Sequence, residues 1–288
     1  MFSVVIPVYN CEKTIIPAIE SVLSQTRLDS VEEILIVNDG STDATDAVIR
    51  QFLTKATPCP IRYFSQSNHG VSYSRNFAIR KAKAPWIALL DADDRWRVNK
   101  LERQIAAIEA EPRVRLLCTQ GRSCGNLFPT RALIRPFKGL NKLDAKVLCI
   151  RSFFITPSVV FHKETGIRLG LFNEAMQYCE DQEFFQKFVL CDGYYFLAED
   201  LVEIDCGKSF SGQWGLSSHL KEMHQGRSQC VKEFSEMGLI SPAYMRLISA
   251  FNELKYIRRV GICTLQRWKF ETLKDRRKHF PQGFSWKA

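Results

Sequence analysis

Long apolar runs are missing from this 288-residue sequence, which argues against a membrane-spanning helix. The best candidate, Val147 to Phe161, contains Arg151 and several hydroxyl residues. The amino terminus, Met-Phe-Ser-Val-Val-Ile-Pro, has no basic segment followed by a long apolar region, so it does not resemble a secretory signal. We therefore expect any membrane contact to be peripheral.

Cys-x-x-Cys pairs are also missing, although the chain contains ten cysteines. Scattered cysteines in a long chain favour reduced thiols in a cytosolic protein, and we expect no structural zinc. No Gly-x-Gly-x-x-Gly or Gly-x-x-x-x-Gly-Lys-Ser/Thr follows an expected strand, which argues against dinucleotide and P-loop sites. A content of 45% hydrophobic and 25% charged residues is typical of a globular protein and argues against disorder.

Positive charge is concentrated at the carboxyl end of the chain. The formal net charge is +9, and residues 255–288 hold ten Lys or Arg against two acids, a balance of +8. The other residues are therefore nearly neutral, at +1. Charge confined to one end gives little support for a protein whose main body binds nucleic acid.

The basic end also has a helical pattern from Phe251 onward. It predicts an amphipathic helix that could lie on an anionic membrane surface through residues 250–288. The alternative is a packing helix followed by a solvated basic end. The apolar side holds Leu254, Ile257, Leu265 and Trp268, and the basic side chains off it are Lys255, Arg259 and Arg267.

Strand and helix patterns alternate through the first half of the chain. Apolar runs predict strands at 2–8, 34–37, 61–64 and 86–90, with helices between them. Parallel strands need crossover connections, and such an alternation supplies them. The sequence therefore predicts an α/β fold with a mostly parallel central sheet and helices on both faces.

Polar residues follow three of these strands, at 7–10, 38–43 and 91–94. They would meet at one edge of the sheet, where open parallel sheets bind their ligands. Asp91 and Asp93 flank one small residue, so their side chains can converge on one hard cation. The alternative is an acidic turn that caps a helix beginning near Asn99.

Four motifs in this order resemble those of family 2 inverting glycosyltransferases. The resemblance is carried mainly by residues 2–110, continues more weakly to about 210, and says little about the tail. It implies a GT-A (nucleotide-diphospho-sugar transferase) fold, a nucleotide-sugar donor with uracil favoured as its base, and Mn²⁺ or Mg²⁺. The motifs are Val5-Ile6-Pro7-Val8-Tyr9-Asn10, Val37-Asn38-Asp39-Gly40-Ser41-Thr42-Asp43, Gly70 with Ser74-Arg75-Asn76, and Asp91-Ala92-Asp93-Asp94.

The resemblance also implies roles in donor binding. Asp39 would accept a hydrogen bond from the base, and Arg75 would lie near the donor phosphates or Asp91. Asp91 would contact the ribose or sugar, and Asp93 would bind the metal that bridges the phosphates, with Asp91 as a second metal ligand. A turn residue for Asp39 and a surface ion pair for Arg75 stay open. The implied donor site comprises Pro7, Val8, Tyr9, Asn10, Asp39, Arg75, Asp91, Ala92, Asp93 and Lys208.

The second half contains an acidic pair, Glu180 and Asp181, just before the apolar helical pattern of residues 184–189. Transfer to an alcohol with inversion needs a base that removes the acceptor proton, and a carboxylate is sufficient. The resemblance points to this pair, and we favour Asp181 over Glu180. Both acids could instead complement the helix dipole.

Further acceptor contacts are implied by the same resemblance. Pro157 and Ser158 precede a strand beside the acceptor, and Trp214 belongs to the Gly/Ser-rich segment 207–215. That segment predicts a lid whose Lys208, or the nearby His219, could reach the diphosphate. An ordinary connecting loop is the alternative.

The predicted organisation is a glycosyltransferase domain at 1–215, divided into a nucleotide-sugar-binding half at 1–110 and an acceptor half at 111–215. A helical basic extension follows at 216–288. The leading hypothesis is a cytoplasmic inverting hexosyl- or N-acetylhexosaminyl-transferase of cell-envelope polysaccharide synthesis. It would act on a glycan or lipid-linked acceptor, with peripheral binding at the inner membrane face.

Two other hypotheses stay open. The first is a nucleic-acid-binding or nucleic-acid-modifying protein that uses the basic tail, although no recognised nucleic-acid module is present. The second is a catalytically inactive family member kept for binding. The presence of both acidic pairs, Asp91/Asp93 and Glu180/Asp181, argues against it.

Overall fold

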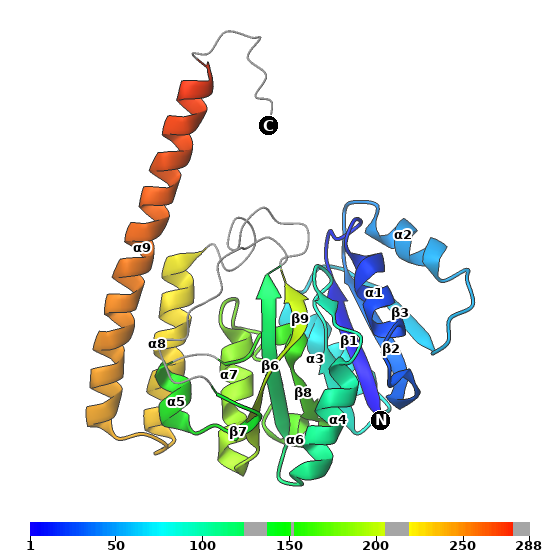
Figure 1. The fold of residues 1–288 in the computed structure, drawn as a ribbon, viewed down its shortest axis with the longest axis horizontal. Coiled ribbons are helices and arrows are strands. Elements are labelled where there is room, and N and C mark those ends of the chain that lie inside the picture. Colours follow the sequence, from blue (N-terminus) through cyan, green and yellow to red (C-terminus); the bar gives the residue numbers. More distant parts are fainter. Residues whose placement is uncertain (124–136, 151–152, 205–218, 279–288) are drawn as a thin grey trace. The chain divides into compact units, whose positions relative to one another are not determined.

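The structure is a computed structural model that describes residues 1–123, 137–150, 153–204 and 219–278 (Figure 1). Side chains of the last helix are described through residue 262. The chain divides into two compact units, Met1–Ser218 and His219–Ala288. The first unit contains the sheet and all four sequence motifs, and the second is helical.

Parallel strands form the first half of the sheet, in the order β3-β2-β1-β4. The strand predicted at 2–8 is β1, with the same bounds. Because crossover helices cover both faces of such a sheet, β1 and β2 are buried along almost their whole length. The elements are β1 (Phe2–Val8), α1 (Ile15–Leu23), β2 (Val31–Asp39), α2 (Thr45–Phe52), β3 (Ile61–Gln66), α3 (Val71–Lys81) and β4 (Trp86–Leu89).

Antiparallel pairs enter in the second half of the sheet. Strand β8 pairs antiparallel with β4 and β6, while β9 runs parallel to β6 and antiparallel to β5 and β7. The predicted parallel arrangement therefore describes the first half, and the whole sheet is mixed. The elements are β5 (Arg95–Trp96), α4 (Lys100–Ala110), β6 (Leu116–Ser123), β7 (Leu140–Lys142), α5 (Ala145–Ile150), β8 (Val160–His162), α6 (Lys163–Arg168), α7 (Glu180–Gln186) and β9 (Tyr194–Ile204).

The sequence alone would predict two short strands at 194–197 and 202–205, but the structure has a single strand here, β9. Its pairing register with β6 shifts on both sides of Gln120, so the ladder continues past an irregularity. The less apolar residues 198–200 lie at this point and divide the apolar pattern in two. A break in apolar patterning was therefore the wrong signal for a strand end.

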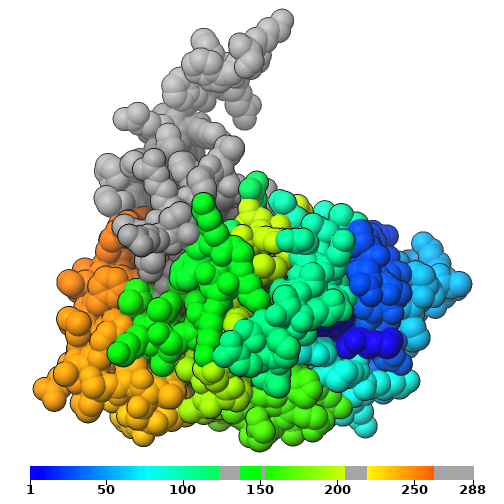
Figure 2. All heavy atoms as spheres, turned by 60° about the horizontal axis from the view of Figure 1, so that its bottom comes forward, coloured from blue at the N-terminus to red at the C-terminus, as the bar shows by residue number. Residues whose placement is uncertain are grey.

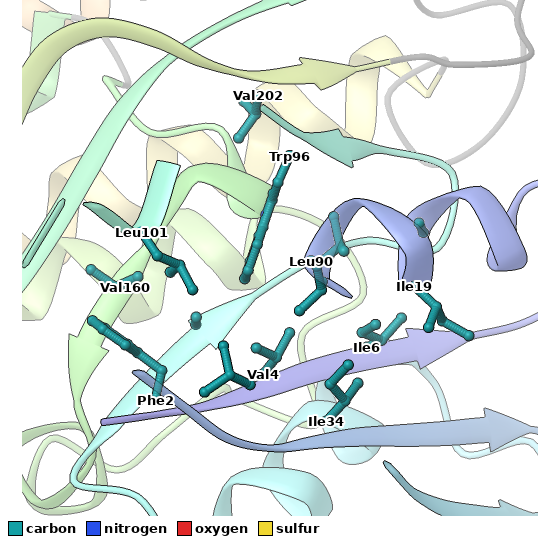
Figure 3. Packing of buried hydrophobic residues seen from close by; sticks show 14 of the residues in the cluster. Phe2, Val4, Ile6, Ile19, Ile34, Leu90, Trp96, Leu101, Val160 and Val202 are labelled. Atoms are coloured by element: carbon teal, nitrogen blue, oxygen red, sulfur yellow. The ribbon is translucent and has the colours of Figure 1, made fainter. Parts of the chain in front are cut away.

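A core cluster lies between the sheet and helices α1 and α4 (Figure 3). Val4 and Ile6 of β1 point into it, together with Ile19 of α1 and Leu101 of α4, and all four are fully buried. Since successive side chains of a strand point to opposite faces, the residues between them face the other side, where α3 contacts β1 and β2. Both faces of the sheet are therefore covered.

The parallel register brings the polar strand ends together, as predicted. Val8 of β1 pairs with Asn38 of β2, and Val5 pairs with Leu89 at the end of β4. The loops that follow are bonded to each other, since the backbone N–H of Thr42 donates to Asn10 Oδ1 at 2.8 Å. Within the first unit, the early segments (blue to cyan) and the later ones (green to yellow) form one continuous surface (Figure 2).

The second unit contains two helices, α8 (Leu220–Glu236) and α9 (Pro242–Lys278). His224 of α8 lies 2.7 Å from Glu253 of α9 and stacks on Tyr256 at 4.5 Å between ring centroids. Buried Phe234 and Ile248 add an apolar contact surface to the pair. No helix in the described part of the chain is both long enough and apolar enough to span a bilayer.

Three short 3₁₀ turns are also present in the described part of the first unit. The short 3₁₀ turns η1 (Leu28–Ser30) and η3 (Lys187–Cys191) lie before β2 and after α7. A third, η2 (Thr156–Ser158), precedes β8 and is buried along its length. Its place directly before β8 puts it beside the residues that follow β4, because β4 and β8 are paired.

Candidate active site

Arg75 lies at the centre of the polar edge, on α3, with only 4% of its surface exposed. Its Nη2 donates to Asp91 Oδ1 at 2.8 Å, and its Nη1 donates to Glu180 Oε1 at 3.1 Å. The guanidinium carbon also lies 5.2 Å from the centroid of the Phe172 ring. One buried side chain thus joins the acids after β4 to the acids of α7, and the alternative of a surface ion pair for Arg75 is wrong.

Ser74 and Asn76, on either side of Arg75 in α3, also form hydrogen bonds to other segments of the chain. Asn76 donates to the Phe172 carbonyl at 2.8 Å and to Glu174 at 2.7 Å, while its Oδ1 accepts from the Phe172 N–H at 3.0 Å. On the other side, Ser74 Oγ accepts from Gln66 at 3.2 Å. The motif Ser74-Arg75-Asn76 therefore connects Gln66 at the end of β3, the acids after β4 and the segment before α7.

The acidic pair of α7 has raised pKa values. Burial and the adjacent Asp181 charge raise the pKa of Glu180 to about 7, against the opposing influence of Arg75. Burial also raises the pKa of Asp181, while the Arg75 charge and hydrogen bonds from the Gln182 N–H and the Thr156 hydroxyl lower it. Two carboxyls in this position hold protons more tightly than free carboxyls do.

The two acids differ in how accessible they are. Glu180 is 6% exposed and is committed to Arg75. Asp181 is half-buried, and its Oδ2 accepts from Thr156 Oγ1 at 3.1 Å. A base that meets an acceptor hydroxyl must be reachable from solvent, so the geometry favours Asp181. The pair does open a helix, since α7 begins at Glu180.

The acidic segment after β4 is a turn in which the Asp94 N–H donates to the Asp91 carbonyl at 3.1 Å. Ala92 is buried in the core cluster, so Asp91 and Asp93 lie on either side of an anchored residue. The proposed capping role is wrong, because β5 intervenes and the N-cap residue of α4 is Asn99. Helix capping therefore does not account for the acidic residues at 91–94.

These carboxylates suit a metal that is shared with a substrate. Among the described residues, no group of three or more His, Cys, Asp or Glu side chains could hold a metal alone. Mg²⁺ and similar cations in phosphate sites need only one or two carboxylates besides the phosphates and water. Asp91 is paired with Arg75, while Asp93 lies close enough to Cys11, after β1, for its charge to help raise the pKa of that thiol. Asp91 and Asp93 therefore fit a hard cation held at the donor edge.

Asp39 orders the loop that precedes α3. Its Oδ1 accepts from Gln66 Nε2 at 2.8 Å and from the His69 N–H at 2.9 Å, and its Oδ2 accepts from the Gly70 N–H at 2.8 Å. The expected Asx-type turn is made by Asn38 instead, whose Oδ1 accepts from the Ser41 N–H. The base contact assigned to Asp39 stays a prediction, and its carboxylate already holds this loop.

The residues after β1 lie at the same edge. Pro7 and Val8 are buried in the sheet, so only their backbone can face a ligand. Tyr9 is 49% exposed, and Asn10 has a left-handed backbone with φ 53° and accepts a hydrogen bond from Thr42. An exposed aromatic ring beside ordered backbone is suited to contact a nucleoside, which is the predicted role of this segment.

The predicted acceptor residues lie partly in the described chain. Ser158 is fully buried, its hydroxyl accepts from the Thr119 N–H at 3.1 Å, and the carbonyl of buried Pro157 accepts from the Trp96 indole. Direct contact of either residue with an acceptor stays a prediction. Lys208 and Trp214 lie outside the described residues, as does the predicted lid at 207–215.

Two site residues were missed in the sequence. Thr156 stands one position before the predicted Pro157-Ser158 and donates to Asp181, and a hydroxyl residue ahead of that pair was the available signal. Lys100 is buried in α4 and was overlooked because lysine is usually a surface residue. The Thr156–Asp181 bond joins positions 25 apart in the sequence, whereas Lys100 contacts Trp96 and Gln104 nearby in the chain.

A family model described as Glycosyl transferase family 2 matches residues 3–172. An uncharacterized glycosyltransferase of Rickettsia typhi is 29% identical over 214 residues, covering 70% of this chain and 63% of that protein. The Escherichia coli UDP-Glc:alpha-D-GlcNAc-diphosphoundecaprenol beta-1,3-glucosyltransferase WfaP is 37% identical over 111 residues, covering 38% of this chain and 42% of that protein. The chain thus spans less than two thirds of the length of these relatives.

The fold is similar to that of S. aureus TarS 1-349 in complex with UDP-GlcNAc. The TM-score is 0.66 at 19% identity, and the match covers 87% of this chain and 71% of that chain. At this identity the similarity is evidence for the fold. The mixed sheet, the covering helices and the acidic turn after β4 define the GT-A class. Within that class, the chain belongs to glycosyl transferase family 2.

Proposed function

We propose that this protein transfers a sugar from a nucleotide-diphosphate donor, with UDP as the nucleotide, to an acceptor hydroxyl with inversion. The observation that carries the proposal is the pairing of Arg75 with both Asp91 and Glu180. It brings the carboxylates suited to a metal and the α7 acid pair, which contains the proposed base Asp181, to one edge of the sheet. Metal-assisted inverting transfer uses both groups around a single donor.

On the donor side, Asp91 and Asp93 would hold Mn²⁺ or Mg²⁺. The metal, when bound, would neutralise charge that develops on the departing diphosphate. Tyr9 and the loop held by Asp39 would bind the nucleoside. Arg75 orients Asp91 through a charge-assisted hydrogen bond of 2.8 Å.

On the acceptor side, Asp181 would take the proton from the attacking hydroxyl. Thr156 orients the carboxylate through its Oδ2, and Arg75 stabilises the ionised form of the neighbouring pair. Glu180 is buried against Arg75 and would hold that arginine in place. The raised pKa of Asp181 makes it a stronger base than a free aspartate while it is ionised.

A lipid-linked or glycan acceptor of envelope polysaccharide synthesis fits these observations. One relative is named for glucosyl transfer from UDP-Glc to a diphosphoundecaprenol-linked sugar, which supports this acceptor class and a hexosyl donor. Such an acceptor would place the enzyme at the cytoplasmic face of a membrane. Helix α9 exposes Leu247, Leu254 and Ile257 by 65%, 66% and 58%, and these side chains would contact that surface.

A nucleotide-sugar screen tests the proposal. Uridine, guanosine and thymidine diphosphate sugars are added with Mn²⁺, and thermal stabilisation and slow donor hydrolysis are measured. We expect uridine diphosphate sugars to stabilise the fold by about 2.7 kcal/mol at a hundred times their Kd. Asp93→Asn should remove the part that depends on Mn²⁺. A flat response to all three nucleotide classes would contradict the proposed function.

The nucleic-acid hypothesis has no comparable support. The nucleic-acid hypothesis does not explain the four sequence motifs, and the family match covers all four. The side chains of residues 263–288, which hold most of the basic residues of the tail at 255–288, lie outside the described part of the chain. Salt-dependent retention on RNA would be its test.

A further inference from the structure

Lys100, the first residue of α4, is fully buried. Its Nζ donates to Gln104 Oε1 at 2.8 Å and lies 3.9 Å from the centroid of the Trp96 ring. Burial lowers the pKa of Lys100 well below its ordinary value, and both the charged and the neutral amine have N–H groups for these two contacts. Burying an amine costs free energy that an apolar side chain of this length would avoid. The polar end of the side chain therefore has a use other than packing.

The two partners of Lys100 both hold the buried turn η2. Gln104 Nε2 donates to the Ser158 carbonyl at 2.8 Å, and Trp96 Nε1 donates to the Pro157 carbonyl at 2.8 Å. Lys100 and the Ser158 carbonyl hold the two ends of the Gln104 amide, with its oxygen toward Nζ and its nitrogen toward Ser158. Without the Lys100 contact, the amide oxygen would lose this donor and the side chain would be held at one end only.

The turn η2 also carries the hydroxyl that contacts Asp181, the proposed general base. Thr156 is the first residue of η2, and its Oγ1 donates to Asp181 Oδ2 at 3.1 Å. A continuous set of hydrogen bonds therefore connects Lys100 to Gln104, to the backbone of η2 and then to Asp181. Trp96 supplies a second connection from the segment that directly follows the Asp91–Asp94 turn.

We propose that Lys100 is a positioning residue for transfer: through Gln104 and Trp96 it fixes η2, and through Thr156 of that turn it fixes Asp181. The inference rests on the proposed function, in which Asp181 is the base. It gives the segment after β4 a second role. Trp96, Lys100 and Gln104, which follow Asp91 and Asp93 in the chain, would also set the position of Asp181. A base displaced by a fraction of an ångström slows proton removal without weakening donor binding.

Lys100→Met tests the inference, because methionine fills a similar volume without an N–H. We expect kcat to fall roughly tenfold, with the donor KM unchanged, as for the loss of one oriented hydrogen bond. Thr156→Val should have a similar effect. If both act through the same connection, the double variant should be no slower than Thr156→Val alone. If the Lys100 side chain only fills space, Lys100→Met should have a normal kcat, and its effect should not be coupled to that of Thr156→Val.

Two further variants keep the test decisive if Lys100→Met does not fold. Trp96→Phe keeps an aromatic ring but removes the indole N–H, and Gln104→Glu keeps the shape but removes the donor to Ser158. Each should lower kcat without raising the donor KM. The matched control is Arg103→Met on the same helix, whose exposed side chain pairs with Glu199 and should leave turnover unchanged.

The outcomes separate the two proposals. Suppose that Asp181→Asn is inactive but Lys100→Met turns over normally, or that Trp96→Phe and Gln104→Glu both do. Such a result would overturn the positioning role and leave the proposed function standing. The positioning role would also be overturned if the double variant lost kcat by the product of the two single losses. Lys100 and Thr156 would then act independently. Normal turnover in Asp181→Asn would overturn the choice of base, and the positioning role with it.

Discussion

Arg75 carries a buried positive charge between two carboxylates that come from separate motifs. A buried ion pair is costly to break from one side, because the remaining charge has neither water nor a partner. Its planar guanidinium can serve both carboxylates at once, which a lysine ammonium does less well. The arginine therefore holds the acids that follow β4 beside the acid pair of α7.

Arg75→Gln should destabilise the fold by about 3–5 kcal/mol, because it leaves Asp91 and Glu180 unpaired at a buried position. Urea unfolding measures the change. The matched control is Arg80→Gln on the same helix, where the side chain is 58% exposed and lies 3.7 Å from Glu174. That exposed pair should contribute less than about 1 kcal/mol. Equal effects of the two substitutions would contradict the role given to Arg75.

The pH dependence of turnover should show the raised pKa of the acid pair. The base works as a carboxylate, so kcat/KM should fall as pH drops through an apparent pKa above that of a free aspartate. The charges acting on Asp181 come from Arg75, which lowers its pKa, and Asp91, which raises it, and the Thr156 hydroxyl lowers it further. Thr156→Val removes that hydrogen bond, so it should raise the apparent pKa and move the acid limb to higher pH. A shift to lower pH would contradict this assignment.

At the scale of elements, the loop held by Asp39 depends on a glycine. Gly40 has φ +73°, and an added Cβ would lie 2.8 Å from the backbone nitrogen of Asn68. The loop at 66–70 would therefore have to move, since backbone atoms cannot simply rotate away. Left-handed backbone alone costs a residue with a Cβ roughly 1–2 kcal/mol.

Gly40→Ala should weaken donor binding as well as the fold, because it displaces the loop that Asp39 anchors at the nucleoside side. Gly139→Ala is the matched control: its φ is +60°, but an added Cβ meets nothing within 4 Å. The control should lose a similar amount of stability from strain and keep its donor affinity. Isothermal titration with the donor found in the screen measures the difference, and unchanged affinity in Gly40→Ala would refute the loop's role.

The elements of the first half could be predicted from sequence because their signals are local. Apolar, β-branched runs and helical periodicity gave β1 with correct bounds and placed Arg75 on α3. The second half was harder, since β5, β7 and β8 are two or three residues long and pair with strands distant in the chain. Short antiparallel strands are fixed by their partners, which periodicity cannot identify.

At the scale of the whole molecule, the site depends on contacts that no local pattern shows. The motif order indicated a family 2 fold, and the family match agrees with it. The bond from Arg75 to Glu180 spans 105 positions, and Lys100 reaches the η2 turn through Gln104. Spacing in sequence could suggest that these residues belong to one site, but only packing decides which acid is buried and which is accessible.

The second unit gives a prediction for the whole chain. Full-length protein should bind vesicles of anionic lipid at low salt and release them as salt rises, since each basic residue near the headgroups contributes about 1 kcal/mol. Replacing Leu247, Leu254 and Ile257 together by serine should abolish binding. The control is Leu190→Ser, a change of another half-exposed leucine in the first unit. Absence of binding by the unaltered protein would end the membrane proposal.

The most direct test of the account is the turnover of Asp181→Asn, measured with the donor and acceptor that the unaltered protein uses. The asparagine keeps the shape of the side chain and can still accept from Thr156, but it cannot take a proton. We predict a loss of roughly 10²–10⁴ in kcat, the usual contribution of general base catalysis, with donor affinity retained. Near-normal turnover in this variant would contradict the assignment of Asp181 as the base.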